Sequence, residues 1–145
     1  MTTFQEKMFL PKRVATQAER ERLMQAIVGR LSRETDILFA YLHGSFAAGE
    51  AFRDIDIGVV VGKEKDLSFE SDLSYELSSA LGQEVEVRMI NDAPVAFQMA
   101  VLTGSILLVS NNDAARTDFI ENVGRRYREY AHFRNIFREA VGAER

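Results

Sequence analysis

The chain has 145 residues, of which 46% are hydrophobic and 28% charged, the ordinary balance of a globular protein with one sizeable core. Its net charge of −4 argues against generic, charge-driven nucleic-acid binding, and the absence of cysteine excludes disulfides, thiolate metal sites and a cysteine nucleophile. No apolar run approaches the ~20 residues that span a bilayer, and the N-terminus lacks the pattern of a secretory signal, so we expect a cytoplasmic protein without a membrane partner.

The first half of the chain predicts one helix followed by two buried strands. Residues 1–16 carry no clear period and are expected to be irregular, whereas apolar residues recur at helical spacing over 17–32. The run 36–42 is short and nearly all apolar, which is typical of a strand buried on both faces. Residues 43–53 contain two glycines and predict a tight turn with at most a short helix, and 55–61 predict a second apolar strand.

The second half alternates helices with short strands. Ser68 is a candidate cap for a helix that ends at Leu81, and residues 84–90 alternate polar and apolar as a half-exposed strand does. A helix is expected over 94–104, and a strand over 105–110. This order predicts an α/β or α+β fold in which a small mixed sheet of about four strands packs against helices.

A long helix is expected from about residue 113 to residue 141. The segment Ala114 to Arg145 has a local charge of +2, which leaves −6 for the rest of the chain and suggests that this segment has a separate role. The aromatic and arginine content fits a docking surface for a protein partner or a homodimer, and core packing is the alternative for about half of the aromatic residues. The expected buried stripe includes Phe119, Val123, Tyr127, Tyr130, Phe133 and Phe137.

Residues at the junction of the two buried strands carry the chemistry. Gly44 allows close approach of a ligand, and Ser45 offers a hydroxyl and a backbone N–H at a turn that can bind phosphate oxygens. Asp54 and Asp56 are spaced i, i+2 at the start of a strand, so their carboxylates point to one face and repel each other unless a cation lies between them. Mg²⁺ prefers such oxygen ligands, which predicts a metal site.

A third carboxylate on the next strand would complete the cluster. Glu84 and Glu86 are both candidates, because alternation places them on one face, and the central position of Glu86 favours it. Two metal ions ~3.5–4 Å apart could then hold the attacking and leaving oxygens of a phosphoryl-type transfer.

The run from Tyr41 to Val60 resembles the signature of the minimal nucleotidyltransferases, within the DNA polymerase beta-like superfamily. Gly44-Ser45, the small-residue stretch that ends at Gly49, and Asp54-x-Asp56 carry this resemblance, which extends to Val85-Glu86-Val87 and to the segment Asn91 to Pro94. The resemblance implies a nucleotidyltransferase domain over 1–112, followed by a C-terminal helix over 113–145 that packs on this domain and forms a possible partner or dimer interface.

The resemblance also implies a reaction. Gly44, Ser45, Gly49 and Arg53 would bind a nucleoside triphosphate such as ATP, while Asp54, Asp56 and Glu86 would be catalytic and hold two Mg²⁺ ions. A hydroxyl group would attack the α-phosphorus and release pyrophosphate, with positioning and electrostatics supplying most of the catalysis.

Three residues depart from the family pattern. Ala48 stands where the family commonly has Arg, Arg53 replaces a small polar residue before the first Asp, and Glu86 replaces the more common Asp. These changes remove one cation that could contact phosphate, add another beside the cluster, and lengthen the third acid by one methylene. They leave a metal carboxylate at all three positions.

Small members of this family resemble antitoxins that are encoded beside HEPN ribonuclease toxins, and some transfer AMP to a tyrosine of the toxin. The expected function is therefore adenylylation of a HEPN-type toxin partner. Two alternatives remain open: an inactive antitoxin that neutralises its partner by binding alone, and a small-molecule transferase of the aminoglycoside type.

Overall fold

The computed structural model describes residues 11–142, so most of the irregular segment expected over 1–16 and the last residues of 113–145 lie outside the described residues. The elements are α2 (Gln17–Leu31), β1 (Ile37–His43), α3 (Gly44–Ala47), β2 (Ile55–Val61), α4 (Ser68–Leu81), β3 (Val85–Met89), α5 (Val95–Leu102), β4 (Ile106–Ser110) and α6 (Asp113–Gly142). The predicted four-stranded mixed sheet is confirmed, and every expected element is present with ends within two residues of those predicted.

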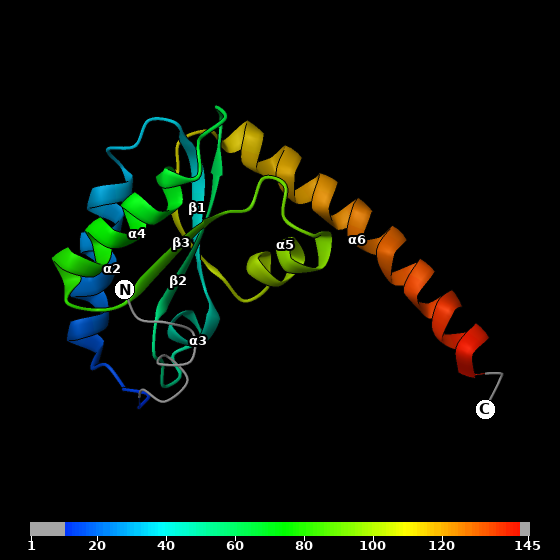
Figure 1. Ribbon diagram of the computed structural model, residues 1–145, viewed down its shortest axis with the longest axis horizontal. Coiled ribbons are helices and arrows are strands. Elements are labelled where there is room, and N and C mark those ends of the chain that lie inside the picture. Colours follow the sequence, from blue (N-terminus) through cyan, green and yellow to red (C-terminus); the bar gives the residue numbers. More distant parts are fainter. Residues whose placement is uncertain (1–10, 143–145) are drawn as a thin grey trace.

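The sheet separates two layers of helices. Its strand order is β3-β2-β1-β4; α2 and α4 lie against one face, whereas α5 and the first part of α6 lie on the other (Figure 1). The larger core joins the first pair of helices to the sheet, and the smaller core joins Phe39, Tyr41 and Val60 to Ile90 and Val101. Burial on both faces explains why β1 and β2 read as almost continuous apolar runs.

Local side chains fix where the helices begin and end. The Thr16 side chain caps α2 by accepting a hydrogen bond from the backbone N–H of Glu19 at 3.1 Å. The prediction that Ser68 caps α4 is wrong, because Ser68 is already helical and its backbone N–H donates to the Asp66 carboxylate at 3.1 Å. Gly82 ends α4 in the left-handed conformation, with φ of 62°.

Strand register brings the candidate site residues to one end of the sheet. β2 runs antiparallel to β1 and parallel to β3, which places Asp56 beside His43 on one side and beside Glu86 on the other. The connection from β1 to β2 contains α3 and returns the chain at this same end. The motif residues from two separate parts of the sequence therefore share one edge of the fold.

Helix α6 extends beyond the body of the protein (Figure 1). Its first half packs as expected, because Val123 is fully buried and the ring of Phe119 lies 5.4 Å from that of Phe39. The predicted buried stripe is wrong in the second half, where Phe133 is 70% exposed and Phe137 is 61% exposed. The helix outruns the elements that could cover it, so the apolar face of its second half meets solvent. None of the helices within residues 11–142 has the length and apolar character needed to cross a membrane.

Candidate functional site

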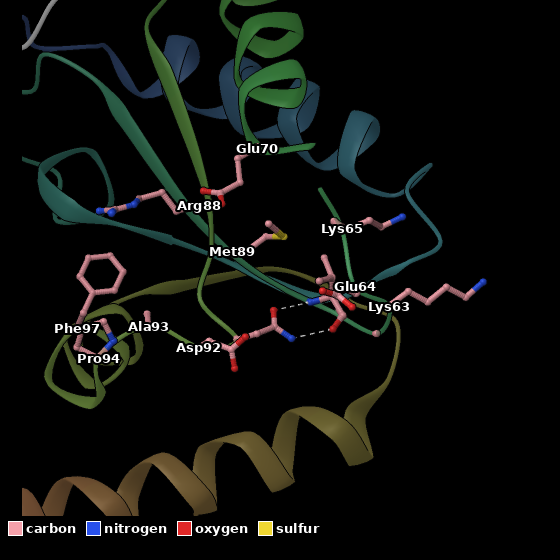
Figure 2. A pocket seen from close by; sticks show the side chains of 13 residues that line it. Lys63, Glu64, Lys65, Glu70, Arg88, Met89, Asp92, Ala93, Pro94 and Phe97 are labelled. Atoms are coloured by element: carbon pink, nitrogen blue, oxygen red, sulfur yellow. Dashed lines mark hydrogen bonds between the residues drawn. The ribbon is translucent and has the colours of Figure 1, made fainter. Parts of the chain in front are cut away.

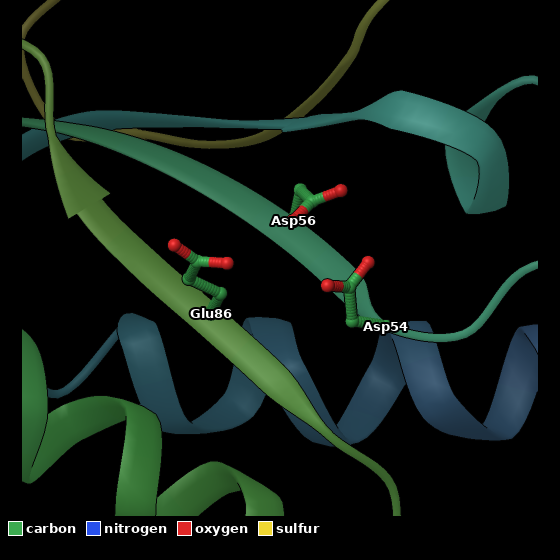
Figure 3. A group of neighbouring side chains, drawn as sticks. All are labelled: Asp54, Asp56 and Glu86. Carbon is green, nitrogen blue, oxygen red and sulfur yellow. The ribbon is translucent and has the colours of Figure 1, made fainter. Parts of the chain in front are cut away.

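Three carboxylates converge where β2 and β3 begin. Asp54 directly precedes β2, Asp56 is its second residue, and Glu86 is the paired residue of β3. One carboxylate oxygen from each lies within 4.8 Å of the other two, and all three side chains are half-buried (Figure 3). Glu84, the other candidate for the third acid, lies outside this cluster, just before β3.

The donor set fits a hard divalent cation. Three carboxylates provide the oxygen ligands that Mg²⁺ prefers, and their half-buried position leaves room for the water or phosphate oxygens that complete its coordination. Without a positive charge between them, carboxylates at this spacing repel each other. A bound cation would therefore favour this arrangement.

Gly44 is shaped by its contact with Asp56. Its φ is 78°, in the left-handed region, and a Cβ at this position would lie 2.6 Å from the Oδ2 atom of Asp56. Any side chain here would displace the Asp56 carboxylate. The glycine of the predicted Gly-Ser motif is thus required by the packing of the acidic cluster, and it brings the backbone of this turn against that cluster.

The other predicted nucleotide-binding residues lie around this turn. Ser45 is half-buried in α3, directly after Gly44. Gly49 lies beyond the other end of α3 with φ of 77°, and the space where its Cβ would point is open. Arg53 is exposed immediately before Asp54, and its backbone carbonyl accepts a hydrogen bond from Gln83 at 2.9 Å. The structure thus brings Gly44 into contact with the acidic cluster and leaves Gly49 farther along the loop.

An aromatic and cationic anchor holds α3 in place. The rings of Phe46 and Phe52 are 4.8 Å apart, and both are buried. The guanidinium of Arg20 stacks 4.3 Å from the Phe46 ring centre and donates a hydrogen bond to the Phe46 carbonyl. Arg13 pairs with Phe52 through two backbone hydrogen bonds of 2.9 Å. The loop is therefore fixed to α2 and to the segment before it.

His43, at the end of β1 beside the acidic cluster, packs against Phe97 of α5. The two rings meet edge to face at 6.0 Å, and the Nε2 atom of His43 is buried without a hydrogen-bond partner. Burial lowers the pKa of His43, the charge of Arg88 lowers it further, and Asp54 opposes the shift. The imidazole is therefore held in its neutral form at neutral pH.

Two arginines near the site were not predicted from the sequence. Arg88 follows Glu86 by two residues, so the alternation of β3 places both on the same face, and this spacing could have revealed it. Arg20 lies on a helix far from the motif in sequence, and nothing in the local pattern points to its contact with Phe46.

Comparison with known proteins adds a family and a set of structural neighbours. Residues 25–114 match the family described as polymerase beta, nucleotidyltransferase. The chain is similar to a chain of the solved structure described as tri-AMPylated Shewanella oneidensis HEPN toxin in complex with MNT antitoxin. The identity is 21% over 81% of this chain and 98% of the other, and the TM-score is 0.65. A toxin–antitoxin structure with AMP-PNP matches at 23% identity over 81% and 97%, with a TM-score of 0.69. The MntA-HepT toxin–antitoxin matches at 20% identity over 87% and 98%, with a TM-score of 0.64.

A search of curated proteins gave no match. At identities of 20–23% these solved structures show a shared fold.

Proposed function

Since its family match covers residues 25–114, the chain belongs to the polymerase beta nucleotidyltransferase family, and from this membership we propose that it transfers AMP from ATP to a hydroxyl group of a protein. The observation that carries the proposal is the convergence of Asp54, Asp56 and Glu86 beside the Gly44 turn. Metal-dependent nucleotidyl transfer needs such carboxylates next to a loop that can receive a triphosphate.

Each part of the site has a role in the proposed reaction. Gly44 and Ser45 bind the triphosphate, with Gly49 and Arg53 completing the loop, and the anchored α3 keeps this loop from moving during the reaction. Asp54, Asp56 and Glu86 would hold Mg²⁺, which supplies positive charge to the phosphate oxygens and favours loss of the proton from the attacking hydroxyl. The half-buried His43, whose imidazole is neutral, packs against Phe97 at the side of the site that faces α5.

A HEPN-type toxin is the proposed protein acceptor, with a tyrosine hydroxyl as the group that is modified. The similarity to a structure described as a tri-AMPylated HEPN toxin with its MNT antitoxin supports this choice. A cytoplasmic location belongs to the same proposal, because both proteins would have to meet ATP and RNA there.

The second half of α6 is the proposed docking surface for this partner. Phe133, Ile136 and Phe137 are each more than half exposed, and Tyr130 and Val141 lie on the same side of the helix. An apolar face of this size on a projecting helix is typical of a protein interface. Residues 125–139 contain five arginines and two glutamates, so two copies of this face would repel each other, and we favour a partner with an acidic rim over a homodimer.

This docking surface also favours the alternative in which the chain neutralises its partner by binding alone. Docking through α6 does not require the carboxylates, and Ala48 removes a cation that the family commonly has near the phosphate loop. The two functions differ in their dependence on Asp54 and Asp56.

Mass spectrometry of the partner tests the proposal. The protein is incubated with Mg²⁺, each nucleoside triphosphate and the HEPN-type protein encoded beside it, and the mass of that partner is measured. We expect a gain of AMP units with ATP, which a variant with Asp54→Asn and Asp56→Asn no longer produces. A variant with Asp72→Asn and Asp118→Asn is the control, because it makes the same charge change at two exposed positions away from the site.

The outcomes separate the hypotheses. An unmodified partner that both the wild type and the Asp54→Asn, Asp56→Asn variant still neutralise would refute the transferase and establish binding alone. Transfer to an aminoglycoside but not to the protein would favour the small-molecule alternative.

A further inference from the structure

A cleft opens next to β3, and one of its lining residues, Arg88, follows Glu86 of the acidic cluster by two residues. Arg88 projects from the same face of β3 as Glu86, and its guanidinium lies 5.0 Å from the centre of the Phe97 ring. Figure 2 shows Arg88 and Phe97 at one end of this cleft, and Lys63 and Lys65 at the other. The arginine and the aromatic ring thus stand where the cleft meets the acidic cluster.

The cleft is large, and both apolar and charged side chains line it. Its volume is about 880 Å³; Met89, Ala93, Pro94 and Phe97 form the apolar part of its lining, and Glu64, Glu70 and Asp92 line it as well. Asn91 is also in the lining, but its side-chain amide is used by the fold, because it pairs with both the N–H and the carbonyl of Val61 at 3.0 and 2.8 Å. The apolar side chains can pack against an aromatic group, whereas the three carboxylates disfavour a second phosphate.

The cationic side chains at the two ends of the cleft differ in whether a carboxylate of the protein already pairs with them. Lys65 is bonded to Asp36, and the Nζ atom of Lys63 lies 3.8 Å from the same carboxylate, so their positive charge is partly neutralised. Arg88 is exposed, and within residues 11–142 it forms no ion pair. One face of its guanidinium rests on Phe97, and its positive charge remains open to a ligand.

The geometry of the proposed transfer assigns a role to this cleft. Gly44 contacts Asp56 from the β1 side, whereas Arg88 lies on β3, beyond Glu86. If the triphosphate lies on the Gly44 turn, pyrophosphate leaves on that side. In-line displacement then requires the attacking hydroxyl to approach from the opposite side, which is the β3 side of the cluster, where Arg88 lies. Phe97 spans the two sides, because its ring contacts both Arg88 and His43.

We propose that this cleft binds the acceptor, and that Arg88 and Phe97 select an aromatic hydroxyl group over an aliphatic one. The inference rests on the proposed function. The acceptor ring packs against Phe97 and the guanidinium, and the positive charge of Arg88 favours the phenolate over the phenol. The phenolic oxygen then bonds to the α-phosphorus while the bond from that phosphorus to its bridging oxygen breaks; pyrophosphate leaves, and the phenolic proton passes through Glu86 to solvent.

Two product analogues test the selection without a partner protein or turnover. Adenosine 5′-(phenyl phosphate) carries an aromatic ring on the phosphate, and adenosine 5′-(ethyl phosphate) carries an aliphatic group in its place. Their dissociation constants are measured with Mg²⁺ by calorimetry, alongside that of ATP. We expect the wild type to bind the phenyl ester about tenfold more tightly than the ethyl ester, a difference typical of ring stacking with a cation.

Variants locate the selection in the cleft. Arg88→Gln and Phe97→Leu should each reduce the preference for the phenyl ester to about twofold or less, whereas Arg22→Gln, at an exposed position of α2, should leave it unchanged. Arg88 is exposed, so Arg88→Gln is the decisive variant if Phe97→Leu disturbs the core near α5.

The possible failures are distinct. A wild type that binds ATP but shows no preference between the esters overturns the assignment of the cleft and leaves the proposed function standing. Equal preference in the wild type and Arg88→Gln overturns the role of Arg88. A wild type that binds neither ATP nor either ester removes the proposed function, and this inference falls with it.

Discussion

Replacing Gly44 by alanine should damage the acidic cluster through a single methyl group. Alanine in the left-handed region costs about 1–2 kcal/mol. In addition, its Cβ would lie 2.6 Å from Oδ2 of Asp56, so this carboxylate must leave its rotamer, at a further cost of about 1 kcal/mol. We expect the free energy of unfolding to fall by about 2–3 kcal/mol, which corresponds to a loss of roughly 8–12 °C in the melting temperature.

Gly82→Ala provides the matched control. Gly82 has φ of 62°, close to that of Gly44, but a Cβ there meets no atom within 4 Å. It should therefore lose only the conformational term of about 1–2 kcal/mol. Urea denaturation followed by circular dichroism measures both variants, and the rise in melting temperature with Mg²⁺ and ATP measures the state of the site.

The ligand-induced rise distinguishes local damage from general instability. We expect Gly82→Ala to keep the rise in melting temperature that Mg²⁺ and ATP cause, and Gly44→Ala to lose most of it. Equal losses of stability in the two variants, together with an equal response to ligand, would refute the argument that Gly44 is glycine because Asp56 occupies its Cβ position.

Three further predictions follow from other parts of the structure. Gln98→Leu should lower the free energy of unfolding by about 1–3 kcal/mol in urea denaturation, because two backbone carbonyls lose the amide of this fully buried side chain. The hydrogen bond from Lys65 holds the pKa of Asp36 below its usual value, so this ion pair stabilises the fold above pH ~4 and the stabilisation is lost as the pH falls through the lowered pKa of the folded state. Asp36→Asn should therefore make the free energy of unfolding less dependent on pH in this acid range. Acid unfolding that is the same in the variant and the wild type would contradict this. The double variant Phe133→Ser, Phe137→Ser should keep the melting temperature of the isolated chain within about 2 °C of the wild-type value, yet weaken partner binding at least tenfold by calorimetry. A large loss of stability would show that this face is covered in the free protein.

The fold was predictable because its local patterns agree with its tertiary environment. The apolar runs of β1 and β2 correspond to central strands covered on both faces, and the helical spacing of Leu23, Ile27 and Leu31 corresponds to the buried side of α2. The start of α4 was predicted one residue too late, because Ser68 is a good capping residue and only the backbone geometry shows that it is already helical.

Strand periodicity and position within the strand were enough to predict the acidic residues of the site, but not the contacts around them. The spacing of Asp54 and Asp56 places them on one face. The same rule left Glu84 and Glu86 as equal candidates on the neighbouring strand, and the central position of Glu86 decided between them. The contact between Gly44 and Asp56, and that between Arg88 and Phe97, depend on how the β1–β2 loop and α5 pack against the sheet. Such packing is tertiary information that spacing does not contain.

The buried stripe predicted on α6 was wrong in its second half for a different reason. Helical periodicity places Val123, Tyr130 and Phe137 near one face of the helix, but it does not say what covers that face. The structure supplies α5 and β1 for the first half and no element within the described residues for the second.

Because only the first half of α6 packs against the rest of the described chain, the two halves of this helix should differ in local stability. A helix of fewer than ~12–15 residues is marginal in water, and the part of α6 after Tyr130 is of this length and has little packing to hold it. We expect its amide hydrogens to exchange with deuterium much faster than those near the buried Val123. A partner that protects these amides would be completing the folding of the helix, and part of the binding free energy would go into ordering it.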